Sequence, residues 1–283
     1  MGQSEPMRIP APGDGIPRRG DGGTRPWTPA RMALVRDRRP LKRWRYVGVY
    51  GPDVMLCAGI VRVAGVPQSF WAVWDRPGGA LRERTRMRLG TVALPDGAVR
   101  VRDRGVAIDL VLEGAGAPVE VTSPHGGSFI WTRKEPASAR GTVVLDGRAI
   151  AVDAPALVDD SAGYHARETA WEWCAGAGHA ADGRAVAWNL VAGVHDAPAA
   201  SERTVWLDGV AHEAGPVAFS PALDAAGDLR FAAEARRARH DRVLFGLIES
   251  EYRQPFGTFS GTLPGGVALA DGYGVMERHR ARW

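Results

Sequence analysis

The sequence predicts an all-β fold of antiparallel strands with little helix. From residue 44 onward, apolar and polar side chains alternate with a period of two, as in strands that bury one face. Asp-Gly pairs at 96–97, 146–147 and 208–209 separate such runs and are typical of two-residue hairpin turns. No strand–helix–strand alternation is visible. Sandwiches and closed barrels are therefore the candidate architectures, and a barrel has the advantage of leaving no exposed edge.

The segments along the chain follow from the same reasoning. Residues 1–26 are dense in Pro and Gly and almost free of large apolar side chains, so we expect a flexible tail. The run 99–114 alternates apolar residues with charged ones on both sides of a turn at 103–105, which indicates a hairpin with one wet face. The segment 228–242 has a helix-like composition, but its neighbours are strands, and we expect a strand here too. The hairpins suggest an N-terminal β domain at 27–150 and a C-terminal β domain at 151–283.

Composition and charge narrow the classes of function. The net charge is +4, but acids interleave most basic runs, so nucleic acid is not the expected partner. The longest apolar stretch, at 54–66, is too short to span a membrane and carries Arg62. Cys57 and Cys174 lie far apart in apolar runs and are expected to be free thiols. Without an apolar leader at its start, the chain is expected to be a soluble, cytoplasmic protein. Its oligomeric state does not follow from these features.

Motifs for metals and cofactors are missing from the sequence. The histidines and cysteines lack the spacing of a zinc site, and we expect no metal and no cofactor. The glycines of the run 175–183 are interpreted as a loop between strands, because no helix follows them as a dinucleotide site requires. The run SPHGGS at 123–128 is interpreted as a turn, since the sequence has no G-x-S-x-G nucleophile motif for it to serve.

The stretch DDSAGYHARETAWEW at 159–173 gives the strongest candidate site. A strand over 164–174 would place one set of polar and aromatic side chains on a single face, and the run 184–196 would add a third tryptophan and an amide from the next strand. These candidate ligand-binding residues are His165, Arg167, Trp171, Trp173, Trp188 and Asn189. Each tryptophan alone is explained by core packing, whereas together they indicate the lining of an apolar-ligand pocket in the C-terminal barrel.

The pair Asp159 and Asp160 and the pair Glu277 and His279 carry the candidate chemistry. Asp159 in apolar surroundings would have its ionised form disfavoured and could act as a proton donor; the alternative is that Asp159 or Asp160 caps a turn. Glu277 and His279 share a strand face near the C-terminus. They are either a functional pair or a salt bridge that closes the barrel, and we favour the salt bridge.

Several motifs together resemble those of a known family. They are KRWRY at 42–46, the run from Asp159 through Gly163 and Thr169 to Trp171-x-Trp173, then Gly183 and Asn189-Leu190, FGTFSG at 256–261 and ERHRARW at 277–283. Over about 40–283 they resemble the bacterial family called domain of unknown function 2804. That family is distantly similar to calycin-like proteins such as carotenoid hydratase and the lipocalin-like pericyclases, which implies two lipocalin-like β-barrel domains in tandem.

The resemblance also implies an acid. It places the proton donor of the hydratases on Asp159, although Asp160 and Ser161 follow here instead of the usual His-x-Trp. The main hypothesis is an enzyme that binds an isoprenoid- or polyketide-like molecule and catalyses hydration, cyclisation or isomerisation, with Trp171 and Trp173 stabilising positive charge. A non-catalytic carrier with the same pocket is the alternative, and an interaction protein that uses its arginine-rich exterior ranks third.

Overall fold

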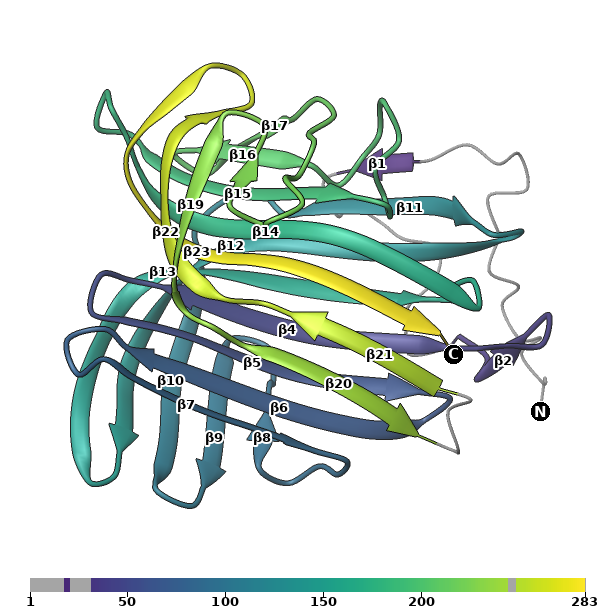
Figure 1. Ribbon diagram of the computed structural model, residues 1–283, viewed down its shortest axis with the longest axis horizontal. Coiled ribbons are helices and arrows are strands. Elements are labelled where there is room, and N and C mark those ends of the chain that lie inside the picture. The colour runs from purple at the N-terminus through teal and green to yellow at the C-terminus, as the bar shows by residue number, and fades with distance from the viewer. Residues whose placement is uncertain (1–17, 21–31, 244–247, 283) are drawn as a thin grey trace, which may run out of the picture.

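The structure, a computed structural model, describes residues 18–20, 32–243 and 248–282. The all-β prediction is confirmed: every strand pairing is antiparallel, and no helix occurs in these residues (Figure 1). Nothing in this part of the chain is a helix long and apolar enough to cross a membrane. Of the predicted flexible tail at 1–26, only Arg18–Gly20 are described, and these form strand β1 against β11. Trp283, the last residue of the C-terminal motif, lies outside the described residues.

The first sheet takes most of its strands from the N-terminal half of the chain. In spatial order they are β7 (Ala80–Arg86), β6 (Val66–Asp75), β5 (Val54–Val63), β4 (Lys42–Tyr50), β13 (Arg148–Gly163), β12 (Ser128–Leu145), β10 (Val106–Gly114), β9 (Ala98–Asp103) and β8 (Val92–Ala93). Strand β12 is long enough to pair also with β11 (Val119–His125). A small separate hairpin is formed by β2 (Val35–Arg36) and β3 (Arg39–Pro40).

The second sheet comes from the C-terminal half. Its spatial order is β17 (Val210–Glu213), β16 (Thr204–Leu207), β15 (Ala185–Ala192), β14 (Glu168–Ala180), β23 (Val267–Arg282), β22 (Phe256–Leu263), β19 (Leu229–Ala235) and β18 (Ala225–Ala226). The hairpin of β20 (Ala238–Val243) and β21 (Ile248–Arg253) joins it along β23. The strand predicted at 228–242 is thus confirmed as β19 and most of β20.

Each sheet curls around an apolar core of its own. In the first sheet, Trp71 of β6 and Val92 of β8 come from opposite ends of the strand order, yet both belong to one core. In the second sheet, Trp188 of β15 and Leu229 of β19 share a core in the same way. In the described residues, no ladder joins the outermost strands of either sheet. The sheets are therefore curled, and two closed barrels in tandem stay a prediction.

A third apolar cluster lies between the two sheets, and we call this layer the inter-sheet seam. It combines side chains of the first sheet with side chains of the second; the larger ones are Tyr46, Tyr50, Met55, Leu157, Trp173, Trp206 and Phe256. Figure 1 shows β20 crossing β5 and β6, and contacts of Arg237 and Gln254, which flank the β20–β21 hairpin, with Cys57 of β5 hold this hairpin against the first sheet. The β20–β21 hairpin of the second sheet therefore covers the part of the seam next to β5.

Two of the three predicted Asp-Gly turns are confirmed; the pair at 96–97 instead lies in a longer connection, because Ala93 of β8 pairs with Arg100 of β9 and Asp96 has no positive φ. Asp146 and Gly147 have φ of 49° and 88°, and Asp208 and Gly209 have φ of 47° and 79°, as the predicted hairpin turns require. The hairpin predicted at 99–114 is β9–β10, and Gly126-Gly127 turns between β11 and β12 as expected for the SPHGGS run.

The interpretation of 175–183 as a loop is wrong, because β14 continues to Ala180. A Cβ atom on Gly176 would lie 2.3 Å from Cζ2 of Trp188, so glycine is needed there to admit the indole.

The chain passes from the first sheet to the second at 164–167. Position 151, the predicted start of the C-terminal domain, lies within β13, which pairs with β12 and β4 in the first sheet. The opening stretch of the candidate site is therefore split between the two sheets, with Asp159 at the end of β13 and Trp171 in β14. How the chain divides into folding units stays a prediction.

Candidate functional site

The two sheets bring Asp159, Trp171, Trp173 and Asn189 together at the seam, whereas Trp188, His165 and Arg167 lie elsewhere. Trp171 and Trp173 of β14 face the seam, where they pack with residues of both sheets. Trp188 is paired with Gly176 on the opposite face of the same sheet and is fully buried in the second sheet's core against Phe259. A pocket lined by all three tryptophans is therefore not formed, because neighbouring positions of a strand point to opposite faces.

Asp159 lies in a buried group of charges within the seam. Its Oδ1 is 2.6 Å from Nζ of Lys134 on β12, and the same Nζ is 3.5 Å from Oε1 of Glu202. All three residues are at most 7% exposed. The Lys134 ammonium also lies 5.8 Å from the ring centre of Trp173. Two carboxyl groups thus share one cation, and one indole face already carries a positive charge.

Burial and mutual contact shift the protonation of this group. Burial raises the pKa of Asp159 and raises that of Glu202 to about 6, although the Lys134 ammonium acts in the opposite direction. Burial also disfavours the ammonium, but the two carboxylates outweigh it and raise the pKa of Lys134. The three groups therefore titrate as a unit in which the lysine stays charged and one carboxyl gains a proton in mildly acidic solution.

The candidate ligand residue Asn189 and a further residue, Thr132, complete this group by hydrogen bonding. Asn189 accepts from Nε1 of Trp173 at 2.6 Å and donates to the backbone carbonyl of Glu202 at 3.0 Å. Thr132 donates to the backbone carbonyl of Asp160. Asn189 is fully buried, and it fixes the orientation of the Trp173 indole.

Glu277 of β23 is a second buried acid in the seam. Its Oε1 accepts from Nε1 of Trp171, and its Oε2 accepts from Nε2 of Gln254, both at 2.7 Å. Gln254 in turn accepts from Nη1 of Arg237. The expected salt bridge between Glu277 and His279 is not formed, because His279 pairs instead with the hydroxyl of Ser250 at 2.8 Å.

The protonation of Glu277 differs from that of Asp159. Burial raises the pKa of Glu277 to about 7, although the two N–H donors act in the opposite direction. The charge of Asp159 adds to the increase, which means that the two acids interact electrostatically. No ion pair to Glu277 is found in the described part of the chain. Glu277 is therefore the carboxyl that retains its proton up to neutral pH.

Partly exposed aromatic side chains lie next to Glu277. We define the mouth as Trp44, Trp171, Tyr252 and His279, which are all partly exposed. Trp44 of β4 and Trp171 are stacked with ring centres 6.3 Å apart and planes 12° apart. His279 lies edge-on to Trp171 at 4.3 Å and to Tyr252 at 5.5 Å. The mouth therefore combines side chains from both sheets, and its Trp171 donates a hydrogen bond directly to Glu277.

The two remaining candidates lie apart from the acids. Arg167 is exposed in the link between the sheets and does not line the seam. Its predicted place on a face with Trp171 fails because β14 begins only at Glu168. His165 is buried in the same link, 5.2 Å from the ring of Trp44 and 5.6 Å from that of His125.

Sequence reasoning missed Lys134, Glu202 and the role of Glu277. Lys134 is one of only two lysines in the chain, and it stands in an alternating strand, which was an available signal. The contact between Glu277 and Trp171 follows from the pairing of β14 with β23, where Trp171 opposes His279 and Trp173 opposes Glu277. That pairing joins residues about a hundred positions apart and has no local signature in the sequence.

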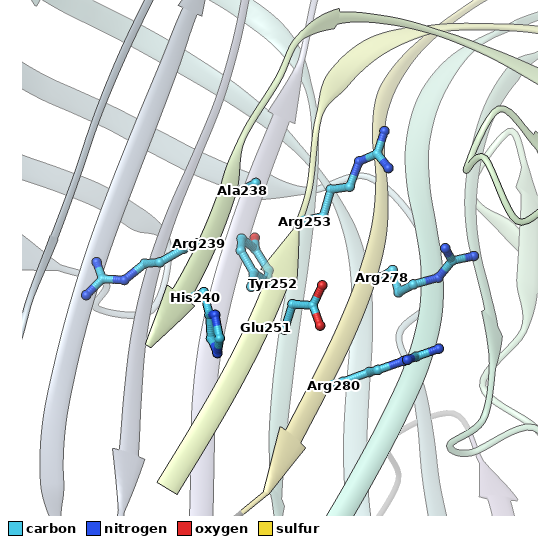
Figure 2. Close-up of a pocket in the computed structure, with 8 residues that line it drawn as sticks. All are labelled: Ala238, Arg239, His240, Glu251, Tyr252, Arg253, Arg278 and Arg280. Carbon is cyan, nitrogen blue, oxygen red and sulfur yellow. The ribbon is translucent and has the colours of Figure 1, made fainter. Parts of the chain in front are cut away.

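A surface cavity of about 430 Å³ lies outside the seam, on the outer face of β20, β21 and β23. Figure 2 shows Arg253, Arg278 and Arg280 on the same side of these strands with Glu251 between them, whereas Arg239 points away. Its walls are mainly charged, which does not suit an apolar ligand. In the described ranges, no three side chains of His, Cys, Asp or Glu are arranged to hold a metal ion.

Comparisons with known proteins add a family and distant structural neighbours. The sequence model of the family described as Domain of unknown function (DUF2804) matches residues 91–283. No protein of curated function matches the sequence.

Among solved structures, a protein of Nitrosomonas europaea described as an AttH is 15% identical and has a TM-score of 0.49, with 84% of this chain and 91% of that chain covered. Kievitone hydratase from Nectria haematococca is 9% identical with a TM-score of 0.48, and 86% and 88% are covered. CghA with Sch210972 is 9% identical with a TM-score of 0.40 at the same coverage. Similarity at this level does not indicate a shared activity.

Proposed function

Because the chain belongs to the family called domain of unknown function 2804, whose name assigns no activity, we propose a function from the geometry of the seam. The protein binds a small apolar, unsaturated molecule between its two sheets and transfers a proton to it from Glu277. The observation that carries this proposal is the contact of the buried Glu277 carboxyl with Trp171, whose ring also forms the wall of the mouth.

The proposed chemistry begins with a carbon–carbon double bond held at the mouth. The Glu277 carboxylic acid donates its proton to one carbon, the π electrons form the new C–H bond, and the other carbon becomes a cation. Water then adds to the cation and loses a proton, or a neighbouring C–H bond loses its proton and a double bond forms again. In both cases the released proton returns to the Glu277 carboxylate, so the products are those of hydration or isomerisation.

The tryptophans of the mouth suit the cationic intermediate. An indole face attracts a nearby cation by about 0.5 to 2 kcal/mol, and more when water is excluded. Trp173 already faces the Lys134 ammonium, whereas Trp44 and Trp171 are partly exposed and carry no cation of the described residues on their faces. The proposal therefore assigns cation stabilisation to Trp44 and Trp171.

Glu277 suits the role of acid better than Asp159, the residue that the family resemblance indicates. The Asp159 carboxyl lies 2.6 Å from the Lys134 ammonium, which acts against the rise in pKa that burial causes. Glu277 has no ion-pair partner among the described residues, and burial raises its pKa to about 7. Asp159 then acts on the reaction through its charge, which helps to keep Glu277 protonated.

A non-catalytic carrier is the second candidate. Both carboxyl oxygens of Glu277 already accept a hydrogen bond inside the protein, as those of a purely structural acid would. A carrier would use the same mouth and would not need the proton. The two functions are distinguished by whether a proton reaches the ligand.

Deuterium uptake is the direct test. We would incubate the protein with farnesol and geranylgeraniol in D₂O near pH 6.5 and measure the mass of the recovered alcohols and their products. Proton transfer to a double bond adds deuterium, and we expect Glu277→Gln to lose this uptake while still displacing the neutral fluorescent probe N-phenyl-1-naphthylamine. Asp159→Asn is expected to reduce uptake and retain part of it.

The outcomes separate the alternatives. Binding by the wild type without any deuterium uptake would leave the carrier function. Uptake that survives Glu277→Gln and is abolished by Asp159→Asn would move the acid to Asp159. If neither alcohol displaces the probe from the wild type, the protein does not bind an isoprenoid at the mouth.

A further inference from the structure

A cluster of buried and partly buried basic side chains lies beside the mouth and has no role in the proton transfer. It consists of Arg39, Lys42, His125, His165 and His195, which come from β3, β4, β11, the link between the sheets and the loop after β15. We call this cluster the basic pocket. Lys42, His165 and His195 are each at most 7% exposed, and His165 is in ring contact with Trp44 of the mouth.

The histidines of the basic pocket have unused hydrogen-bonding nitrogens. Nε2 of His125, Nδ1 of His165 and Nε2 of His195 are buried and have no partner in the described part of the protein. The hydroxyl of Ser128, at the start of β12, is in the same situation. His195 is oriented by its other nitrogen, which lies 2.8 Å from the hydroxyl of Ser123. Buried polar atoms are normally paired, so several unpaired ones in one region indicate a missing polar partner.

The charges that act on these histidines are all positive. His125 experiences Lys42 and Arg39, His165 experiences Lys42 and both other histidines, and His195 experiences Lys134 and His125. Burial, followed by these charges, lowers the pKa of each imidazole, and burial lowers that of Lys42 to about 6. Lys134, one of the charges that act on His195, is itself paired with Asp159 and Glu202.

We propose that the basic pocket binds an oxyanion, either a carboxylate or a phosphate group. An anion would accept hydrogen bonds from the free imidazole nitrogens and would compensate the repulsion among the basic side chains. A bound anion favours the protonated forms of Lys42 and of the imidazoles, whose pKa values are lowered in its absence, so binding takes up protons. Oxyanion binding is therefore stronger at pH 5.5 than at pH 8.

The position of the basic pocket suggests how it relates to the mouth. His165 contacts Trp44, and Trp44 stacks on Trp171, so an anionic head group in the basic pocket would direct an attached apolar chain along these rings. The assignment of the oxyanion to the substrate rests on the proposed function. The preference of the pocket for an oxyanion does not.

Calorimetric titration with three probes tests the inference: inorganic phosphate, decanoate and 1-decanol. We expect phosphate, decanoate or both to bind the wild type with proton uptake, seen as a heat that depends on the buffer. His165→Asn should weaken this binding by roughly tenfold or more, because a hydrogen bond to a charged group is lost. The exposed His212, on β17, provides the control, and His212→Asn should bind as the wild type does.

A second variant guards against misfolding. His125 is only partly buried, and His125→Asn should reduce oxyanion binding without the loss of a fully buried ring. Phosphate binding would indicate a site for free oxyanions, and binding of decanoate alone would indicate the head group of a larger ligand.

The inference is overturned if neither anion binds, or if folded His165→Asn and His125→Asn both bind them like the wild type. Equal binding of decanol and decanoate, with no effect of either variant, would overturn the inference of an oxyanion site. It would still agree with binding of an apolar chain at the mouth.

Discussion

Replacing Glu277 by glutamine should change how the stability of the protein depends on pH. Glu277 is 6% exposed and accepts one hydrogen bond at each carboxyl oxygen. Glutamine has nearly the same shape and can still accept from Trp171, but it places an amide group opposite Nε2 of Gln254. This exchange by itself costs the variant some stability that does not depend on pH, so the informative quantity is how its difference from the wild type changes with pH.

The magnitude follows from the pKa of Glu277. Burial raises it from an ordinary value of 4.5 to about 7. In the interval between these values, the folded state holds a proton that the unfolded state has released, so stability falls as the pH rises. Each unit of pKa corresponds to about 1.4 kcal/mol, so the wild type should lose about 3 kcal/mol from this one group between pH 4.5 and 7.5. The glutamine variant lacks that loss.

Urea denaturation of both proteins at intervals from pH 4.5 to 8 measures the effect. Several buried histidines act in the opposite direction; burial, for example, lowers the pKa of His279 to about 3, so stability falls as pH decreases below 6.5. These contributions are common to both proteins and cancel in the difference. Relative to the wild type, Glu277→Gln should gain about 3 kcal/mol on going from pH 4.5 to 7.5.

Glu251→Gln is the matched control, because it removes an exposed carboxyl from the neighbouring strand β21. Its difference from the wild type should stay nearly constant with pH. If the difference between wild type and Glu277→Gln is also constant over this range, Glu277 is ionised throughout. The assignment of Glu277 as a neutral-pH acid is then refuted.

Two further variants test the packing of the seam and of the second sheet. Asp159→Asn should lower the free energy of unfolding at pH 7 by about 3 to 5 kcal/mol, because it leaves the buried Lys134 without its nearest counter-charge. Adding Lys134→Met should restore part of the loss. An unchanged denaturation midpoint in Asp159→Asn would contradict the ion pair. Gly176→Ala should destabilise by about 1 to 3 kcal/mol, because the new Cβ would lie 2.3 Å from Trp188 and 2.5 Å from the carbonyl oxygen of Tyr273; a thermal midpoint equal to that of the wild type would show that the indole can move aside.

The periodicity of the sequence was sufficient to predict where the strands lie, but it was insufficient to predict which side chains pack against them. Alternation and Asp-Gly turns located most hairpins, including β9–β10 and the long pair β12–β13. Alternation also placed Trp171 and Trp173 on one face of a strand correctly. It could not show that both faces of β14 are buried, with Trp173 in the seam and Cys174 in the second sheet's core. The prediction therefore grouped Trp188 with the wrong neighbours.

The candidate site was predicted less well than the fold, for a related reason. Asp159 was recognised as a buried acid, but its partners Lys134 and Glu202 are supplied by β12 and by the segment before β16, on different sheets. Contacts across two facing sheets depend on how the sheets are oriented, and no local pattern in the sequence encodes that orientation. Glu277 was interpreted as half of a salt bridge because its other neighbours could not be foreseen.

The arrangement of buried charges also limits where a ligand can act. Buried ion pairs contribute little to stability compared with well-packed apolar side chains, so a seam that contains Lys134, Asp159 and Glu202 is not explained by folding alone. In the seam, Arg237 is bound to Glu83 and Gln254, and the basic pocket lies next to Trp44 of the mouth. In the proposed function, a ligand reaches Glu277 past the partly exposed rings of the mouth. A substitution that fills the mouth should therefore block probe binding and proton transfer together, whereas one in the arginine-lined surface cavity should affect neither.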